Sequence, residues 1–224
     1  MQSFYDSIAK KWDATRQRPW GEFEFAKDFL SAEKILDAGC GNGRLVTWLR
    51  ENNFNGEYLG VDSSQELIKL ARRNFPGEKF EATDLLELIP QLSGELTLGG
   101  FGAIFCIAVL HHFENSADRA KVLENLHEVL EPGGKIFLTT WNLWQPRFWK
   151  FFLAHPRLRG GRLSRNLEIP FAGKSSRRVH AFTKSELFKL LATAGFKNIK
   201  IFYAKHSAKA NFLTGRNIVI IAEK

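Results

Sequence analysis

Three glycines in five positions follow a short apolar run in LDAGCGNGRL, residues 36–45. Glycine inside a regular element costs roughly 0.5–1 kcal/mol relative to alanine, so such a cluster answers a geometric demand. Gly39, Gly41 and Gly43 allow a tight turn and the close approach of a flat or charged ligand to free backbone N–H groups. The pattern predicts a nucleotide-type site, and a sharp turn without any ligand is the alternative.

Three aspartates lie where they could complete such a site. Asp62 follows Gly43 by about twenty residues, the spacing at which an adenosine ligand offers its ribose hydroxyls to a carboxylate. An acid here could instead cap the next helix. Asp84 ends a third strand and is a candidate for the adenine amine. Asp37 is an acid in an apolar strand, and because burying an unpartnered carboxylate costs several kcal/mol, we expect it to orient the glycine loop or to meet a cationic ligand group.

Strand and helix patterns alternate along the chain and must position these residues. The expected strands are 34–39, 57–62, 79–84, 102–110 and 134–141, and the expected helices between them are 42–52, 64–75 and 119–130. Amphipathic segments at 4–12 and 21–30 predict an N-terminal helical lead-in. Apolar strands that alternate with helices predict a parallel sheet covered on both faces, with the glycine loop between the first strand and the first helix.

Charge is distributed unevenly between the two parts of the chain. Residues 147–224 hold 17 Lys and Arg against three acids, whereas residues 1–146 hold 15 basic and 21 acidic residues. This asymmetry predicts that the C-terminal part meets a polyanion, with nucleic acid ahead of an acidic membrane surface. A basic but unspecialised solvated surface is the alternative.

Residues 142–179 combine Trp144 and Trp149 with the arginine-rich run RLRGGRLSR. We expect a long loop without regular structure here, and interleaved aromatics and arginines suit a phosphate backbone with unstacked bases. A flexible basic linker is the alternative.

Composition limits the remaining possibilities. A chain of 224 residues with 44% hydrophobic content is expected to form one domain. Cys40 and Cys106 lie far apart, without the spacing of a zinc site or a disulfide scaffold, so we expect a reducing cytoplasm and no metal. The N-terminal segment lacks the apolar stretch of a signal peptide, and no run reaches the roughly 18–20 apolar residues of a membrane span, so no membrane is expected.

Four motifs together carry a family likeness. ILDAGCGNG, GVDSS, ATDL and LEPGGKIFLTTW, in this order and spacing, resemble the class I S-adenosylmethionine-dependent methyltransferases across about residues 30–141. The resemblance implies an α/β fold: a Rossmann-like three-layer αβα sandwich whose seven-stranded, mostly parallel sheet ends in an antiparallel hairpin of strands 198–205 and 215–224. It implies N-terminal helices in 1–31, a cofactor core in 32–141, a substrate-covering insertion after the fifth strand in 142–182, and a C-terminal helix with the hairpin in 183–224.

The same resemblance implies S-adenosylmethionine as cofactor and S-adenosylhomocysteine as product. The residues that it assigns to cofactor binding are Asp37, Gly39, Cys40, Gly41, Asn42, Gly43, Asp62, Ser63, Asp84, Leu85, Ile107 and Ala108.

A narrower likeness lies outside this core. FYDSIAKKWDATRQRPW, IAVLHHF, TTWNLWQPRF and RRVHAFTKSELFKLLATAGF resemble the tRNA wobble-uridine carboxymethyl methyltransferases of the eukaryotic type and their bacterial relatives. The implied catalytic residues are Arg16, His112, Arg178 and His180, and the implied substrate-binding residues are Trp20, His111, Trp141, Asn142 and Arg177. The chain departs from that family in NLEIPF, which lacks a tryptophan after the proline, and in KSSRRVHAF, which has valine where an aromatic residue is common.

The implied reaction needs no general base, because a carboxymethyl group with a pKa of roughly 4 is already an anion at neutral pH. The implied partners are tRNA, bound through the basic C-terminal half, and a small activating protein. Two other functions stay open: methylation of a metabolite such as a carboxylic acid or quinone, and a catalytically silent module that binds RNA or protein. His111 and His112 could also simply cap the fourth strand.

Overall fold

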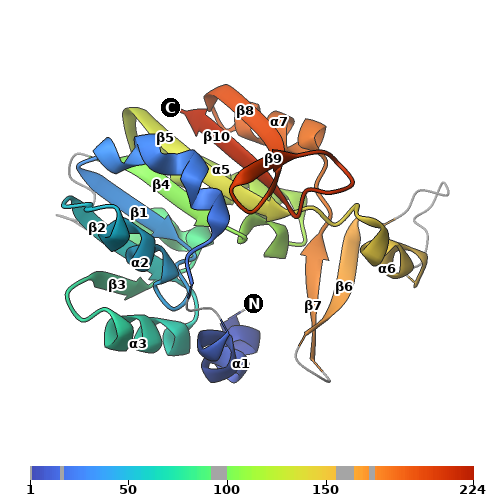
Figure 1. Cartoon of the computed structure of the whole chain (residues 1–224), viewed down its shortest axis with the longest axis horizontal. Coiled ribbons are helices and arrows are strands. Elements are labelled where there is room, and N and C mark those ends of the chain that lie inside the picture. Colours follow the sequence, from blue (N-terminus) through green and yellow to red (C-terminus); the bar gives the residue numbers. More distant parts are fainter. Residues whose placement is uncertain (1, 16–17, 92–99, 155–163, 172–174) are drawn as a thin grey trace.

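Helices cover both faces of one sheet in the computed structural model, which describes residues 2–15, 18–91, 100–154, 164–171 and 175–224 (Figure 1). The sheet has the strand order β3–β2–β1–β4–β5–β10–β8–β9. Its strands are β1 Lys34–Ala38, β2 Glu57–Asp62, β3 Lys79–Ala82, β4 Phe101–Ile107, β5 Leu130–Trp141, β8 Lys197–Lys205, β9 Ala208–Ala210 and β10 Asn217–Glu223. The α-helices are α1 Gln2–Ala14, α2 Arg44–Glu51, α3 Gln65–Asn74, α4 Leu88–Gln91, α5 Ser116–Val129, α6 Trp149–Ala154 and α7 Lys184–Thr193. Short 3₁₀ helices are η1 Gly21–Ser31, η2 Leu85–Glu87, η4 Leu110–His112 and η5 Pro146–Phe148.

Five parallel strands form the cofactor half of the sheet, as the sequence predicts. β1 pairs with β2 and β4, β2 pairs with β3, and β4 pairs with β5. These strands read as apolar runs because both of their faces are buried. Since parallel strands end at the same edge, the residues that follow Ala38, Asp62 and Ile107 meet in one crevice.

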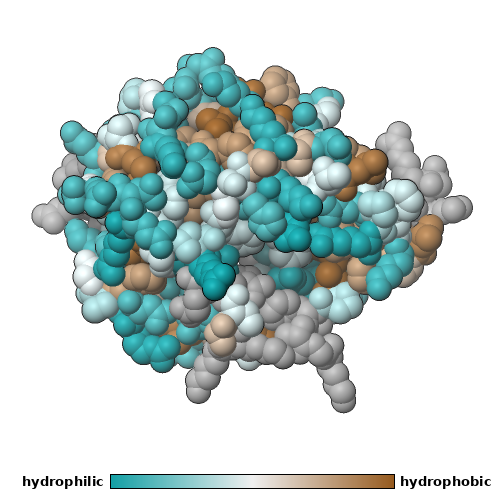
Figure 2. Space-filling model, viewed as in Figure 1, coloured by the Kyte–Doolittle hydropathy of each residue, from teal (hydrophilic) through white to brown (hydrophobic). Residues whose placement is uncertain are grey.

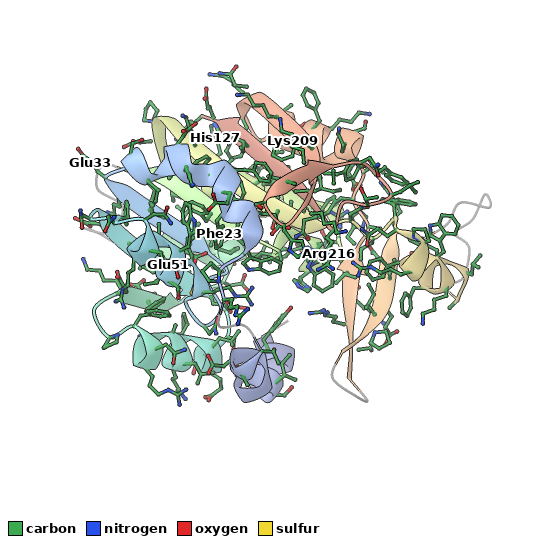
Figure 3. The ribbon with its side chains drawn as sticks, viewed as in Figure 1. Phe23, Glu33, Glu51, His127, Lys209 and Arg216 are labelled. Atoms are coloured by element: carbon green, nitrogen blue, oxygen red, sulfur yellow. The ribbon has the colours of Figure 1, made fainter. Side chains whose placement is uncertain are left out.

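Alternate residues of each strand supply the two cores on either side of the sheet. Ile35 packs in the core shared with η1, α2 and α3, whereas Leu36 packs in the core shared with α5 and α7. On the first face, Phe23 of η1 (Figure 3) has its ring centroid 5.3 Å from that of Trp48 and 6.0 Å from that of Phe105. The expected three-layer αβα arrangement is confirmed.

The antiparallel end of the sheet is also confirmed, with one extra strand. β10 runs antiparallel to both β5 and β8. The expected count of seven strands is wrong, because the chain turns back after β8 and Ala208–Ala210 pairs with the end of that strand as β9. His206 stands in this turn with a left-handed φ of 57°, which allows the reversal within two residues.

The segment after β5 has regular structure, contrary to the expectation of a loop. Its described residues contain η5, α6 and an antiparallel pair of strands, β6 Asn166–Phe171 and β7 Ser175–His180. A small core of its own holds this segment, in which Phe152 of α6 packs with Leu167, Ile169 and Val179 of the pair. Strand alternation explains this core, since every second side chain of a hairpin faces the same side.

Figure 2 shows a mostly hydrophilic surface on which the apolar residues lie in separate spots.

Candidate functional site

A cavity of about 420 Å³ opens at the carboxyl ends of β1, β2 and β4. This volume falls within the range of roughly 300–1,000 Å³ for small-molecule sites. Of the twelve residues expected to bind the cofactor, eleven line the cavity: Asp37, Gly39, Cys40, Gly41, Asn42, Asp62, Ser63, Asp84, Leu85, Ile107 and Ala108. Trp20, His112 and Trp141 of the expected acceptor-side residues line it as well.

The glycine loop needs all three of its glycines. Gly39, Gly41 and Gly43 have φ values of 86°, 59° and 85°, a left-handed conformation that side chains disfavour. A Cβ on Gly39 would lie 2.2 Å from Cγ2 of Val109. A Cβ on Gly43 would lie 2.8 Å from the ring of Phe75. Gly43 is the one expected cofactor residue that does not line the cavity, because it is the buried N-cap of α2.

Asp62 holds the glycine loop against the end of β2. Its carboxylate accepts hydrogen bonds from the backbone N–H of Gly41 at 3.0 Å and of Ser64 at 2.9 Å. Burial raises its pKa to about 6, although these two hydrogen bonds act in the opposite direction. The alternative of a cap for α3 does not apply to Asp62, since Ser64 is the N-cap and its hydroxyl accepts from the N–H of Leu67.

Asp37 lies buried beneath the same loop. The hydroxyl of Tyr58 donates to its carboxylate at 2.9 Å, and burial raises its pKa to about 7. The charge of Arg44, which also lines the cavity, lowers this pKa. Asp84 lies at the rim, where its side chain accepts from the N–H of Leu86 and caps η2.

An aromatic wall lies on the side of the cavity that faces β7; we define it as Tyr5, His112 and Trp141, which line the cavity, together with Arg177, which is not among the lining residues and contacts the ring of Trp141. The Arg177 guanidinium lies 4.1 Å from the Trp141 ring centroid, and the hydroxyl of Tyr5 lies 2.9 Å from Nε2 of His112. Burial, with the charge of Arg177 second, lowers the pKa of His112 to about 3, so its imidazole is neutral.

His111 lies behind this wall rather than in the cavity. It is fully buried, its ring centroid is 4.6 Å from that of Trp141, and burial lowers its pKa well below 6.5. Neither ring nitrogen has a hydrogen-bond partner among the described residues. His111 therefore supports the wall by packing.

Two further expected residues, Asn142 and Arg178, do not reach the cavity. Asn142 donates through Nδ2 to the backbone oxygens of Phe212 and Gly215, so it fixes the loop before β10. Arg178 is exposed, with its guanidinium 3.4 Å from the carboxylate of Glu114. Arg16 lies outside the described residues.

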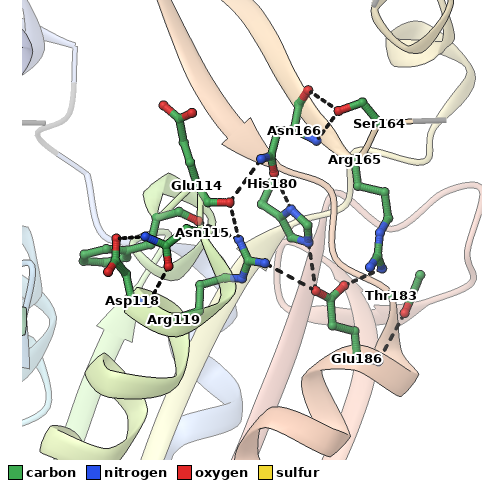
Figure 4. A network of polar contacts seen from close by, with 11 residues as sticks. Glu114, Asn115, Asp118, Arg119, Ser164, Arg165, Asn166, His180, Thr183 and Glu186 are labelled. Atoms are coloured by element: carbon green, nitrogen blue, oxygen red, sulfur yellow. Dashed lines mark hydrogen bonds and ion pairs between the residues drawn. The ribbon is translucent and has the colours of Figure 1, made fainter. Parts of the chain in front are cut away.

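His180 does not line the cavity and belongs to a separate polar network (Figure 4). Its Nε2 lies 2.9 Å from Glu186 and its Nδ1 lies 2.6 Å from Asn166. Glu186 also accepts from Arg165 at 2.6 Å and lies 3.9 Å from Arg119. Burial alone would raise the pKa of Glu186, but these three basic side chains together lower it. The network fastens the β6–β7 pair to α7 and α5.

Tyr5 and Arg44 are among the cavity residues that the sequence analysis did not assign to the site. Tyr5 fits the helical spacing of an amphipathic segment, which gives no sign that its hydroxyl reaches His112. Arg44 follows the third glycine, and its guanidinium carbon lies 4.8 Å from the ring centroid of Trp20. The glycine pattern predicts the loop, but it gives no sign that Arg44, the next residue, lines the cavity.

The part of the chain that the structure describes holds neither a cluster of metal ligands nor a membrane-spanning helix. Among these residues no three His, Cys, Asp or Glu side chains gather as a metal site would require. No described helix has the length and apolar character needed to cross a bilayer.

Comparison with known proteins decides the family. A family model described as a methyltransferase domain matches residues 36–136. A putative methyltransferase from Encephalitozoon cuniculi is 30% identical over 199 residues, which cover 87% of this chain and 85% of that protein. The chain belongs to the class I S-adenosylmethionine-dependent methyltransferases.

Other methyltransferases agree with this assignment. The tRNA (carboxymethyluridine(34)-5-O)-methyltransferase of Schizosaccharomyces pombe is 29% identical over 212 residues, covering 85% of this chain and 86% of that protein. The enzyme of the same name, ALKBH8, from Mus musculus is 31% identical over 142 residues, covering 63% of this chain. The chain spans about a fifth to a third of the length of the first four curated relatives. A solved S-adenosylmethionine-dependent methyltransferase from Methanosarcina mazei shares the fold, with a TM-score of 0.65, 20% identity, and coverage of 85% of this chain and 92% of that one.

The cavity fits S-adenosylmethionine, the cofactor of this methyltransferase. The molecule carries positive charge on its sulfonium and its ammonium group, and the cavity offers the buried carboxylate of Asp37 and the half-buried carboxylate of Asp62. Burial raises the pKa values of both carboxylates, and a cationic ligand would lower them. A Cβ on Gly39 would collide with Val109, another residue that lines the cavity, so glycine keeps the loop close to the end of β4.

Proposed function

We propose that this methyltransferase esterifies the carboxylate of a carboxymethyl-modified wobble uridine in tRNA. The observation that carries the proposal is the aromatic wall, which joins a cation to stacking surfaces and contains no side chain suited to act as a base. The relative in Schizosaccharomyces pombe is named for this activity and aligns with most of the chain, which adds support.

The low pKa of His112 makes it a poor general base, and an acceptor that is already ionised needs no such base. A general base works best with a pKa near the operating pH, and the pKa of His112 is about 3. A phenol or quinol, with a pKa of roughly 10, would need such a base, whereas a carboxylate with a pKa of roughly 4 needs none. Asp37, whose pKa of about 7 is nearer, lies at the donor end and accepts from Tyr58.

The cation of the wall suits an anion that must be oriented rather than held tightly. When bound, S-adenosylmethionine supplies an electrophilic methyl group on a positively charged sulfur. Because the carboxylate loses its charge as the ester forms, a strong ion pair would stabilise the reactants more than the transition state. Arg177 faces the ring of Trp141 at 4.1 Å, and this shared contact moderates its pull on an anion. The chain contributes alignment and the exclusion of water.

Basic and aromatic side chains beyond the cavity suit an RNA. Arg147, Trp149 and Lys150 lie exposed on the segment after β5, and Lys209 and Arg216 lie on the C-terminal segment (Figure 3). Burial, and after it the charge of the neighbouring Arg216, lowers the pKa of Arg147. Neighbouring cations favour contact with phosphates. We therefore expect the affinity for tRNA to fall steeply as salt is added.

The test uses labelled S-adenosylmethionine and total RNA from cells that lack the activity, followed by nucleoside mass analysis. We expect label on a carboxymethyluridine and its release by mild alkali, because esters hydrolyse in base. Alkali-stable label would move the reaction to a ring atom or a ribose oxygen, and label confined to small metabolites would favour the metabolite enzyme. Filter binding of bulk tRNA at two salt concentrations is the companion measurement, and weak, salt-insensitive binding contradicts the proposal.

A matched pair of variants tests the role of the wall. Arg177→Gln removes the cation over Trp141, and Lys121→Gln removes an exposed cation of α5 outside the cavity. We expect the first to raise KM for the acceptor by about tenfold to a hundredfold, the range for a hydrogen bond to a charged group, and the second to leave it unchanged. Equal effects in the two variants would contradict the assignment.

A further inference from the structure

Helix α1 is fastened to the two loops that form the donor half of the cavity. The carboxylate of Asp13 accepts from Nδ2 of Asn42, in the glycine loop, at 2.9 Å. The carboxylate of Asp6 accepts from the hydroxyl of Ser64 at 2.6 Å and from the N–H of Glu66 at 3.2 Å, at the start of α3. An acid at a helix N-terminus is favoured by the exposed N–H groups there. The position of α1 therefore depends on the loops that surround the cofactor.

Tyr5 extends from this helix into the cavity and meets the acceptor side. It lines the cavity, and its ring lies edge-on to that of His112 with centroids 5.6 Å apart. Its hydroxyl lies 2.9 Å from Nε2 of His112 and is hydrogen-bonded to the side chain of Arg177. One hydroxyl thus touches two members of the aromatic wall, which come from η4 and β7.

The direction of these hydrogen bonds follows from the donors available. Arg177 can only donate, so the Tyr5 oxygen accepts from it. The imidazole of His112 donates to the backbone carbonyl of Arg178, and with Nε2 directed at Tyr5 the neutral ring carries its proton on Nδ1. Tyr5 therefore donates to Nε2, and a single chain of hydrogen bonds links Arg177, Tyr5, His112 and the backbone of β7.

We propose that Tyr5 is a positioning residue for the methyl acceptor: its hydroxyl fixes the Arg177 guanidinium and the His112 ring in the aromatic wall. Because α1 is hydrogen-bonded to Asn42 and Ser64, Tyr5 also links the position of the two donor loops to the position of the acceptor side. The inference rests on the proposed function in one respect, that the acceptor is an anion which Arg177 orients. A residue that served only the packing of α1 would have no need of its hydroxyl.

The test compares Tyr5→Phe with Tyr203→Phe, which removes a hydroxyl from β8, outside the cavity. Three quantities are measured: kcat/KM for the acceptor, the Kd for S-adenosylhomocysteine by calorimetry, and the ¹⁵N shifts of the His112 ring, assigned by their loss in His112→Gln. We expect Tyr5→Phe to lower kcat/KM by about tenfold, as for a lost hydrogen bond to a charged group, and to leave the Kd within about twofold. The His112 Nε2 signal should move, because it loses its donor, and Tyr203→Phe should change none of the three.

The outcomes separate this inference from the proposed function. An unmoved His112 signal in Tyr5→Phe, or an unchanged kcat/KM in a variant that still binds S-adenosylhomocysteine, overturns the positioning role. A Kd weakened as much as kcat/KM also overturns it, because that pattern marks a structural loss of α1. If no RNA accepts the methyl group while the His112 signal still moves and kcat/KM for the true acceptor falls, the positioning role stands and the tRNA assignment falls.

Discussion

We expect the free energy of unfolding of Asp37→Asn, measured relative to wild type, to increase from pH 5 to pH 8. Burial raises the pKa of Asp37 from 3.8 to about 7, even though the hydroxyl of Tyr58 donates to it. A group whose pKa is raised on folding contributes its full stability below the unfolded pKa and loses it as the pH rises through the folded pKa. The wild-type protein therefore loses stability between about pH 4 and pH 7, and an asparagine, which cannot ionise, avoids that loss.

The size of the effect follows from the pKa difference at Asp37. About three pKa units correspond to about 4 kcal/mol of unfolding free energy in total, and about 2–3 kcal/mol of it falls between pH 5 and pH 8. The buried amide of asparagine brings its own penalty of about 1–3 kcal/mol, which is the same at both pH values and cancels in the comparison. Asp62, with a pKa of about 6, titrates in both proteins.

Urea unfolding without cofactor at pH 5 and pH 8 measures this quantity. The exposed Asp28, replaced by asparagine, is the matched control. We expect the stability difference between Asp37→Asn and wild type to grow by about 2–3 kcal/mol from pH 5 to pH 8, and the control to stay within about 0.5 kcal/mol. A change at Asp37 no larger than in the control would refute the reasoning that burial raises its pKa.

Three other substitutions test separate parts of the site. Gly39→Ala should lower the free energy of unfolding by about 2–3 kcal/mol, through the contact with Val109 and the left-handed backbone, and adding Val109→Ala should recover only part of this in thermal unfolding. Asp62→Asn should weaken S-adenosylhomocysteine binding by about tenfold to a hundredfold in calorimetry at pH 8, because a charge-assisted hydrogen bond to the glycine loop is lost; a change below about threefold contradicts this. Glu186→Gln should destabilise the protein by about 2–3 kcal/mol, whereas Glu124→Gln on the exposed face of α5 should not, and equal urea midpoints would remove the central role of this carboxylate in the network of Figure 4.

The cofactor half could be predicted because its rules are local. The turn after β1 needs left-handed backbone at Gly39, Gly41 and Gly43, and glycine is the residue that adopts it freely. Asp62 ends β2, and parallel strands bring their carboxyl ends together. These features connect a pattern of residue types to a position in space without knowledge of distant contacts.

The acceptor side could be predicted only in part, as Trp20, His112 and Trp141, because the rest depends on contacts between distant segments. His180 reads as a catalytic histidine from its motif, but the fold directs it to Glu186, six residues along the chain. Tyr5 reads as a helix position, yet it meets His112, which is 107 residues away. The sequence does not predict the strand pair β6–β7, because the core of this pair comes in part from Phe152 of α6.

The main sheet ends on both sides in a very short strand, β3 with four residues and β9 with three. Each carries a lysine, Lys79 and Lys209, and a charged residue on a brief edge opposes the addition of a strand from another molecule. The extra strand that exceeds the expected seven pairs with the last three residues of β8, 203–205, on its outer side. We expect these two short, charged edges to limit edge-to-edge aggregation in concentrated solution.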